Sequence, residues 1–96
     1  MTETVTVGIT NKRGLHARAA AKFVKVVAGF DAEVEVVKLG QGEDDSQPVV
    51  GGSILGLMML GADPGSKLAI SASGAQATQV LAALRELIEN KFGEGE

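Results

Sequence analysis

Hydrophobic and polar residues alternate along the chain with two different periods. In residues 4–10, Val5, Val7 and Ile9 alternate with threonine and glycine, which predicts a strand with one buried face. Further strand-like segments are residues 32–39, 49–50 and 67–73. Because alternation of this kind is typical of antiparallel strands, we expect a sheet that is covered on one side only.

Between these segments the apolar residues follow the period of a helix. The segment from His16 to Gly29 and the segment 76–92 each place their large apolar residues on one face, and Gly93 is expected to end the second of them. Residues 53–60 form a shorter, almost wholly apolar helix with Ser53 as its N-cap. The order β-α-β-β-α-β-α predicts an α+β fold of two layers.

Loops account for the remaining residues. Residues 40–48, rich in glycine and acids, read as a hairpin loop in which Glu43, Asp44 and Asp45 are solvated. The last residues, 93–96, are expected to be disordered.

Length and composition indicate a single domain over residues 1–96. The chain contains 45% apolar residues and no cysteine, so its core must form without disulfides. Neither an export signal nor an apolar run of the roughly 20 residues that span a bilayer is visible. We therefore expect a soluble, monomeric, cytoplasmic protein without membrane contact.

Positive charge gathers in one segment of an otherwise acidic chain. Residues 11–25 carry five of the nine basic side chains and no acid, a charge of +5 against −8 for the rest of the chain. The small number of aromatics, three phenylalanines, and the sequence pI of about 5.1 speak against nucleic acid as the partner. Docking onto acidic proteins is the better use of this segment.

His16 is the only histidine and is predicted to lie at the N-terminus of a helix. The positive end of the helix dipole disfavours the imidazolium form, and the neutral ring keeps a nitrogen lone pair. The first-turn N–H groups, those of Ala17 and Arg18, could then hold phosphoryl oxygens, with charge-assisted bonds from the Arg18 side chain. A simple cap is the alternative for His16.

Other chemistries fail on the residues available. One histidine without cysteine cannot build an ordinary zinc site, and no phosphate-binding GxxxxGK[ST] loop is present. No cofactor and no metal are expected. A Ser-His-Asp hydrolase would need a cleft that so short a chain hardly offers, and a non-reactive protein-binding module stays open as a remote alternative.

Two segments resemble one known family. "GLHARAAAKFV" resembles the active-site segment of HPr, the histidine phosphocarrier of the bacterial phosphotransferase system, and "SILGLMMLG" is similar to the family's regulatory-serine helix. The likeness covers residues 4–92. It departs from the family at Ala19, where most members carry proline. The resemblance implies a four-stranded antiparallel sheet in strand order 1-4-2-3 with three helices on one face.

The resemblance also implies a function. Enzyme I, charged by phosphoenolpyruvate, would phosphorylate His16 at Nδ1, and the group would pass to a histidine of an EIIA protein. The chain would then be a carrier rather than a complete enzyme. Ser53 matches the serine that HPr kinase/phosphorylase modifies, and an apolar docking patch beside His16 would comprise Leu15, Ile54, Leu55 and Met58.

The branch of the family is indicated by weaker features. The acidic loop and the segment "GFDAEV" resemble those of the nitrogen-type regulatory branch, NPr, whereas a serine at position 53 resembles the HPr branch. We favour the regulatory relay. The alternative is a general HPr of sugar transport.

Overall fold

The computed structural model describes residues 2–40 and 45–94. Four strands form one antiparallel sheet in the order β1-β4-β2-β3, which confirms the predicted topology. The strands are β1 (Thr2–Gly8), β2 (Glu33–Lys38), β3 (Val49–Val50) and β4 (Lys67–Ser73). The helices are α1 (Ala17–Ala28), α2 (Ile54–Met59) and α3 (Ala77–Glu89), and a 3-10 turn, η1 (Lys91–Gly93), follows.

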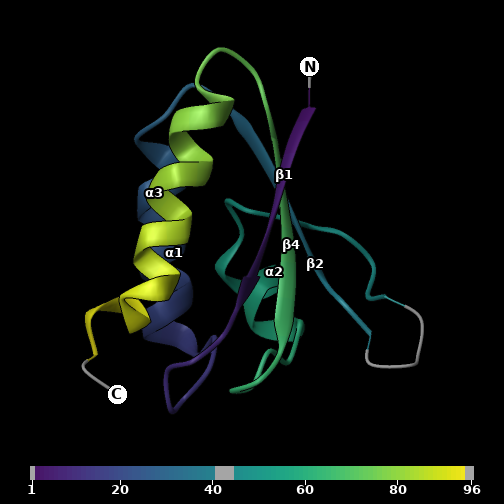
Figure 1. Ribbon diagram of the computed structural model, residues 1–96, viewed down its shortest axis with the longest axis vertical. Helices are drawn as coiled ribbons and strands as arrows, with labels where there is room; N and C mark the ends of the chain where they lie inside the picture. The colour runs from purple at the N-terminus through teal and green to yellow at the C-terminus, as the bar shows by residue number, and fades with distance from the viewer. Residues whose placement is uncertain (1, 41–44, 95–96) are drawn as a thin grey trace.

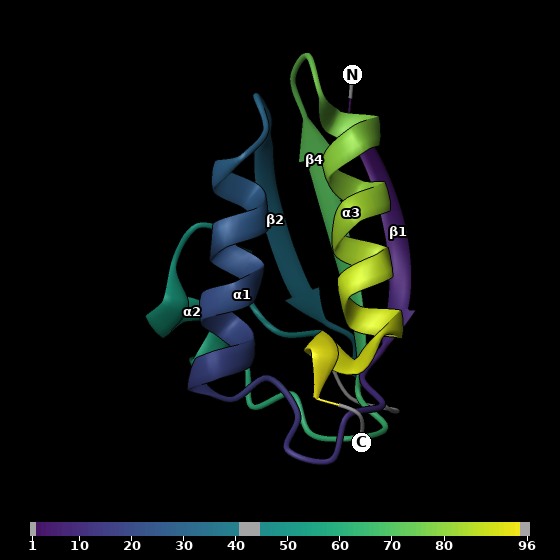
Figure 2. The same cartoon turned by 90° about the vertical axis from the view of Figure 1, so that its left-hand side faces the viewer.

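The helices lie together on one face of the sheet, as Figures 1 and 2 show. The central strand β4 turns Leu68, Ile70 and Ala72 toward them, and all three are buried. Antiparallel register sets Ile70 between Val5 of β1 and Val36 of β2. The period-two pattern therefore produced the single apolar face that was expected of it.

The two longer helices close the core over this face. α1 contributes Ala19, Ala20 and Phe23, all 0% exposed, and it ends at Gly29 as predicted. α3 contributes the buried residues Ala77, Val80, Leu81, Leu84 and Ile88. In the described part of the chain, no helix combines the length and the apolar character needed to cross a membrane.

The C-terminal segment differs from the prediction. α3 ends at Glu89 rather than continuing to Phe92, because Lys91 and Phe92 adopt positive φ angles of 53° and 54°. This turn buries Phe92 at 1% exposure. The predicted disorder is wrong for Gly93 and Glu94, since the Glu94 carboxylate is hydrogen-bonded to residues near the other end of the chain.

The loop after β2 is described at its two ends only. Asp45 accepts a hydrogen bond from the Gly40 N–H at 2.9 Å, and the Ser46 N–H donates to the Lys38 carbonyl at 2.9 Å. These bonds close the loop in front of β3. Glu43 and Asp44, predicted to be solvated there, lie outside the described residues.

Candidate functional site

A tight turn places His16 at the start of α1. Gly14 has φ of 66°, and a Cβ atom there would lie 2.3 Å from the Ala62 carbonyl oxygen, so only glycine fits. The next residue, Leu15, donates its N–H to that same oxygen at 2.9 Å. The loop before α1 is thereby fastened to the loop after α2, and His16 follows directly.

His16 is the N-cap of α1, as predicted. Its backbone is extended, with φ of −77° and ψ of −178°, and its carbonyl accepts the Ala20 N–H at 2.8 Å. The ring nitrogen Nδ1 accepts the Arg18 N–H at 3.2 Å. The imidazole thus occupies the position that a Ser or Asp oxygen takes in an ordinary N-cap.

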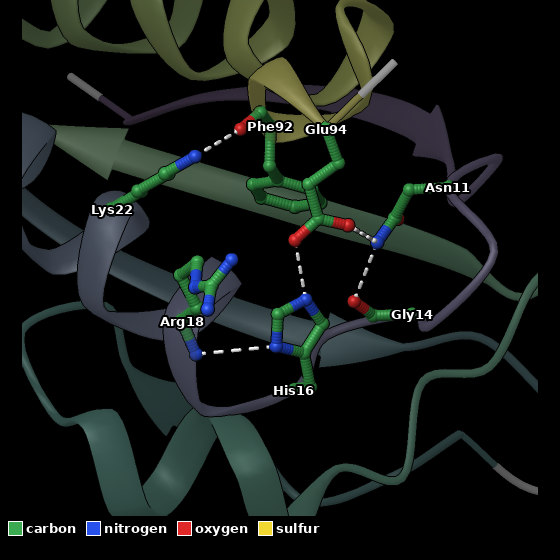
Figure 3. Close-up of polar contacts among 7 residues, drawn as sticks. All are labelled: Asn11, Gly14, His16, Arg18, Lys22, Phe92 and Glu94. Carbon is green, nitrogen blue, oxygen red and sulfur yellow. Dashed lines mark hydrogen bonds and ion pairs between the residues drawn. The ribbon is translucent and has the colours of Figure 1, made fainter. Parts of the chain in front are cut away.

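The other ring nitrogen contacts a carboxylate. Nε2 of His16 lies 2.5 Å from Oε2 of Glu94, and the two side chains are 17% and 14% exposed (Figure 3). A carboxylate can only accept, so Nε2 carries the hydrogen. Nδ1, which accepts from Arg18, then keeps its lone pair, and these two hydrogen bonds define the neutral Nε2–H tautomer.

Asn11, the residue that begins the turn, supports this arrangement. Its amide nitrogen donates to Glu94 Oε1 at 3.1 Å and to the Gly14 carbonyl at 2.8 Å, while the residue is 0% exposed. Its side-chain oxygen has no hydrogen-bond partner among the described residues. Asn11 therefore links the glycine turn to the carboxylate that contacts His16.

The Glu94 carboxyl is ionised in this setting. Partial burial raises its pKa, but the hydrogen bonds from Asn11 and His16 and the nearby charge of Lys22 outweigh this, and the pKa lies below its ordinary value of 4.5. Because its pKa is lower in the folded chain than in the unfolded chain, the ionised Glu94 carboxyl stabilises the folded chain at pH values above 4.5. That contribution is lost as the pH falls through the folded-state pKa.

Ala17 and Arg18 occupy the first turn of α1, where they were predicted, and both are exposed. In Figure 3 the Arg18 side chain extends on the same side of α1 as the His16 ring. No acidic residue lies in this first turn. An anion at Nδ1 would meet the positive end of the helix dipole without a competing carboxylate in that turn.

An exposed apolar surface lies on α2, which packs against α1 (Figure 2). Its members and their exposed fractions are Ile54 at 42%, Leu55 at 68%, Met58 at 42% and Met59 at 76%. The remaining large residues of this segment, Leu57 and Leu60, are buried. We call the four exposed residues the α2 patch.

Leu15 does not belong to the α2 patch. It is 5% exposed and packs in the core, because the turn at Gly14 directs it inward. The structure therefore corrects its expected place on an exposed docking surface. Ser53 stands where it was predicted, as the N-cap of α2, and its hydroxyl accepts the Gly56 N–H at 3.0 Å.

The sequence pattern did not reveal Asn11 and Glu94 as parts of the site. No sequence pattern predicts that the Asn11 amide is buried, and its place beside the predicted turn is the only signal. Glu94 lies 78 residues from His16, in a stretch that reads as a polar tail. Only the return of the chain through η1 brings the two together.

Comparison with known proteins places this chain in a family. The family described as "PTS HPr component phosphorylation site" matches residues 3–90, which is most of the chain. The chain belongs to the HPr family. The HPr-family members similar to it include the phosphocarrier protein HPr of Pseudomonas aeruginosa, 47% identical over 92% of each chain, and the phosphocarrier protein NPr of Escherichia coli, 37% identical over 98% of this chain and 99% of that one.

HPr structures agree with the fold. A crystal structure of HPr-C-His from Thermoanaerobacter tengcongensis matches with a TM-score of 0.84 at 41% identity, covering 96% of this chain and 97% of that one. The family and its relatives are phosphocarriers of the phosphotransferase system by name. As a member of the HPr family, this chain is therefore a phosphocarrier of that system.

Proposed function

We propose that Nδ1 of His16 accepts a phosphoryl group from enzyme I and passes it to a histidine of an EIIA protein. The observation that carries this is the pair of hydrogen bonds at the ring, Arg18 N–H to Nδ1 and Nε2 to Glu94, which leaves the lone pair on Nδ1. Nδ1 is also the nitrogen at the N-terminus of α1. The nucleophile and the donors for the incoming phosphoryl oxygens thus share one place.

The transfer moves one phosphoryl group from enzyme I to Nδ1 of His16. The Nδ1 lone pair of His16 forms the new N–P bond, and the bond from phosphorus to the donor atom of phosphorylated enzyme I breaks, returning its electron pair to that atom. The first-turn N–H groups of Ala17 and Arg18 and the Arg18 guanidinium stabilise the charge on the equatorial oxygens. Passage to EIIA repeats the step with His16 as the leaving group.

The experiment that tests this function is labelling of the wild-type chain by enzyme I and phosphoenolpyruvate. We expect one phosphate per chain, stable in alkali and lost in acid, as is typical of an N–P bond. Adding an EIIA protein should then remove the label from this chain. Label that resists acid, or that stays on the chain when EIIA is present, would contradict the proposal.

The α2 patch is proposed as the docking surface for both partners, centred on Ile54, Leu55 and Met58. Exposed methionine and leucine side chains adapt to differently shaped partners, and the exposed basic residues Arg18 and Lys25 of α1 add charge attraction. A carrier must also leave its partners quickly. We therefore expect each interface to bury about 1,200 Å² or less, the range of weak, transient complexes.

A charge in the α2 patch should slow phosphoryl acceptance. We expect Leu55→Glu and Met58→Glu to lower the rate on the order of tenfold, because the new carboxylate must lose its water in each complex. A time course of labelling by enzyme I, with samples quenched at set times, measures the rate, and thermal melting checks the fold. Ala82→Glu, on the exposed face of α3, is the matched control. Rates equal to that of the control would remove the α2 patch from the docking surface.

For the branch, we propose a nitrogen-type regulatory relay. The acidic loop at 40–48 and the segment "GFDAEV" support it, as does the alignment with NPr over 98% of the chain. A second candidate, general sugar-transport HPr, is favoured by the higher identity of 47% to the HPr of Pseudomonas aeruginosa. Competing a nitrogen-type EIIA against a sugar-type EIIA for the phosphorylated chain separates the two. Faster transfer to the sugar-type acceptor would favour the second candidate.

Ser53 is proposed as a site of regulatory phosphorylation by an HPr kinase/phosphorylase. It precedes the α2 patch directly, with Ile54 and Leu55 as the next residues. A phosphate there would interact favourably with the N-terminus of α2 and would place a dianion beside an apolar docking surface. The fold should therefore persist while docking is impaired.

A further inference from the structure

The Glu94 carboxylate is held at the site from two sides. Oε2 contacts Nε2 of His16 at 2.5 Å, the shorter of the ring's two hydrogen bonds. Oε1 accepts from Asn11 at 3.1 Å, and Asn11 is itself tied to the Gly14 carbonyl. Both carboxylate oxygens thus have fixed partners in the loop that carries His16.

The backbone that presents Glu94 is anchored as well. Phe92 is 1% exposed in the core, and its carbonyl accepts a hydrogen bond from the Lys22 ammonium of α1 (Figure 3). Lys91 and Phe92 have positive φ, a conformation that residues with a Cβ atom rarely adopt, and burial of the phenyl ring offsets its cost. Glu94 is therefore held in place by a packed turn, because it follows the buried Phe92 by two residues.

The two hydrogen bonds of the His16 ring involve different nitrogens. The Arg18 N–H can only donate, so Nδ1 accepts it with its lone pair. The bond to the Glu94 carboxylate requires Nε2 to donate, so Nε2 carries the hydrogen. Both bonds favour the Nε2–H tautomer, and of the two partners Glu94 is the side chain, which can be substituted without altering the backbone of α1.

We propose that Glu94 is a positioning residue for phosphoryl transfer, holding the hydrogen of His16 on Nε2 and facing the positive charge that the ring acquires when Nδ1 is phosphorylated. This role rests on the proposed function. It assigns the C-terminal turn a part in the reaction, since that turn places the Glu94 carboxylate against Nε2 of His16.

The charge balance of the step shows what the carboxylate supplies. Nδ1 donates its lone pair to phosphorus while Nε2 keeps its hydrogen, so the ring becomes cationic as the bond from phosphorus to enzyme I breaks. The Glu94 carboxylate, already 2.5 Å from Nε2, stabilises this charge without moving. In the onward step the ring departs from phosphorus with its electron pair and returns to the neutral Nε2–H form.

Two variants separate the charge of Glu94 from its capacity to accept a hydrogen bond. Glu94→Gln keeps an acceptor oxygen and removes the negative charge, and Glu94→Ala removes both. Glu86→Gln, at an exposed position of α3, is the control with the same change of net charge. Thermal melts establish that all three are folded.

The readouts are the ¹⁵N chemical shifts of the His16 ring and the rate of enzyme I-dependent phosphorylation. In the wild type, Nε2 should have the shift of a protonated nitrogen and Nδ1 that of an unprotonated one. In Glu94→Ala the two shifts should converge as the tautomers mix, and the rate should fall on the order of tenfold or more, as expected for loss of a charged hydrogen-bond partner. Glu94→Gln should lose rate with less change in the shifts.

The outcomes distinguish this role from the proposed function. If the wild type and Glu86→Gln take up no phosphate, the proposed function fails, and the role of Glu94 fails with it. If both take up phosphate and the Glu94 variants match them in rate, only the role of Glu94 is refuted. A slower Glu94→Ala whose ring shifts equal those of the wild type would also refute it, because the effect would then reach enzyme I by another route.

Discussion

His16→Ala is expected to take up no acid-labile phosphate from enzyme I and phosphoenolpyruvate. The chain has a single histidine, so no second imidazole can replace the lost nucleophile. The variant also loses the Nδ1 cap of the Arg18 N–H, which costs about 1 kcal/mol. For a domain of this size that corresponds to a fall in Tm of about 4–8 °C, so the protein should remain folded. Radiolabelling with acid and alkali treatment, followed by a thermal melt, measures both effects.

His16→Asn sharpens this experiment. Asparagine is a good N-cap whose side-chain oxygen can accept the Arg18 N–H, but it has no nucleophilic nitrogen. It should recover stability relative to His16→Ala and still take up no label. Undiminished acid-labile labelling in either variant would refute His16 as the acceptor.

Ser53→Asp is expected to lower the rate of phosphorylation by enzyme I on the order of tenfold or more. A carboxylate at the N-cap satisfies the Gly56 N–H and interacts favourably with the helix dipole, so the fold should be kept. Its charge, however, lies beside the exposed Leu55 and must be desolvated when a partner covers the α2 patch. Phosphoserine, with a charge of about −1.5 to −2, should have the larger effect.

Two variants control for the change at Ser53. Ser53→Ala removes the cap at a cost of about 1 kcal/mol but adds no charge, and its rate should stay near that of the wild type. Ser46→Asp makes the same chemical change in the loop before β3 and should also leave the rate unchanged. Equal rates for all of these folded proteins would mean that Ser53 is an ordinary N-cap and no switch.

The largest part of the fold was predictable because it depends on short-range periods. Val5 and Val7 face the core since alternate residues of a strand point to the same side, and Phe23 does so since it continues the apolar face of α1. The prediction failed at the end of α3, where a helical reading of Lys91 and Phe92 was wrong. Burial of the Phe92 ring outweighed the local preference for right-handed backbone, and this competition depends on a core that no local pattern contains.

The sequence by itself determined the half of the site that surrounds Nδ1 of His16. His16 follows a glycine turn and precedes a helix, and the N-cap hydrogen bond it makes reaches only as far as Arg18, so neighbouring residues decide it. The N-cap hydrogen bond from the Gly56 N–H to the Ser53 hydroxyl is likewise decided by neighbouring residues. The tertiary structure alone decided that Leu15 is buried, since its exposure depends on the loop after α2, and that Glu94 meets Nε2 of His16. Contacts between residues 78 positions apart form only when the sheet and helices pack. Closing so long a loop costs chain entropy, and only the free energy gained by packing the whole core offsets that cost.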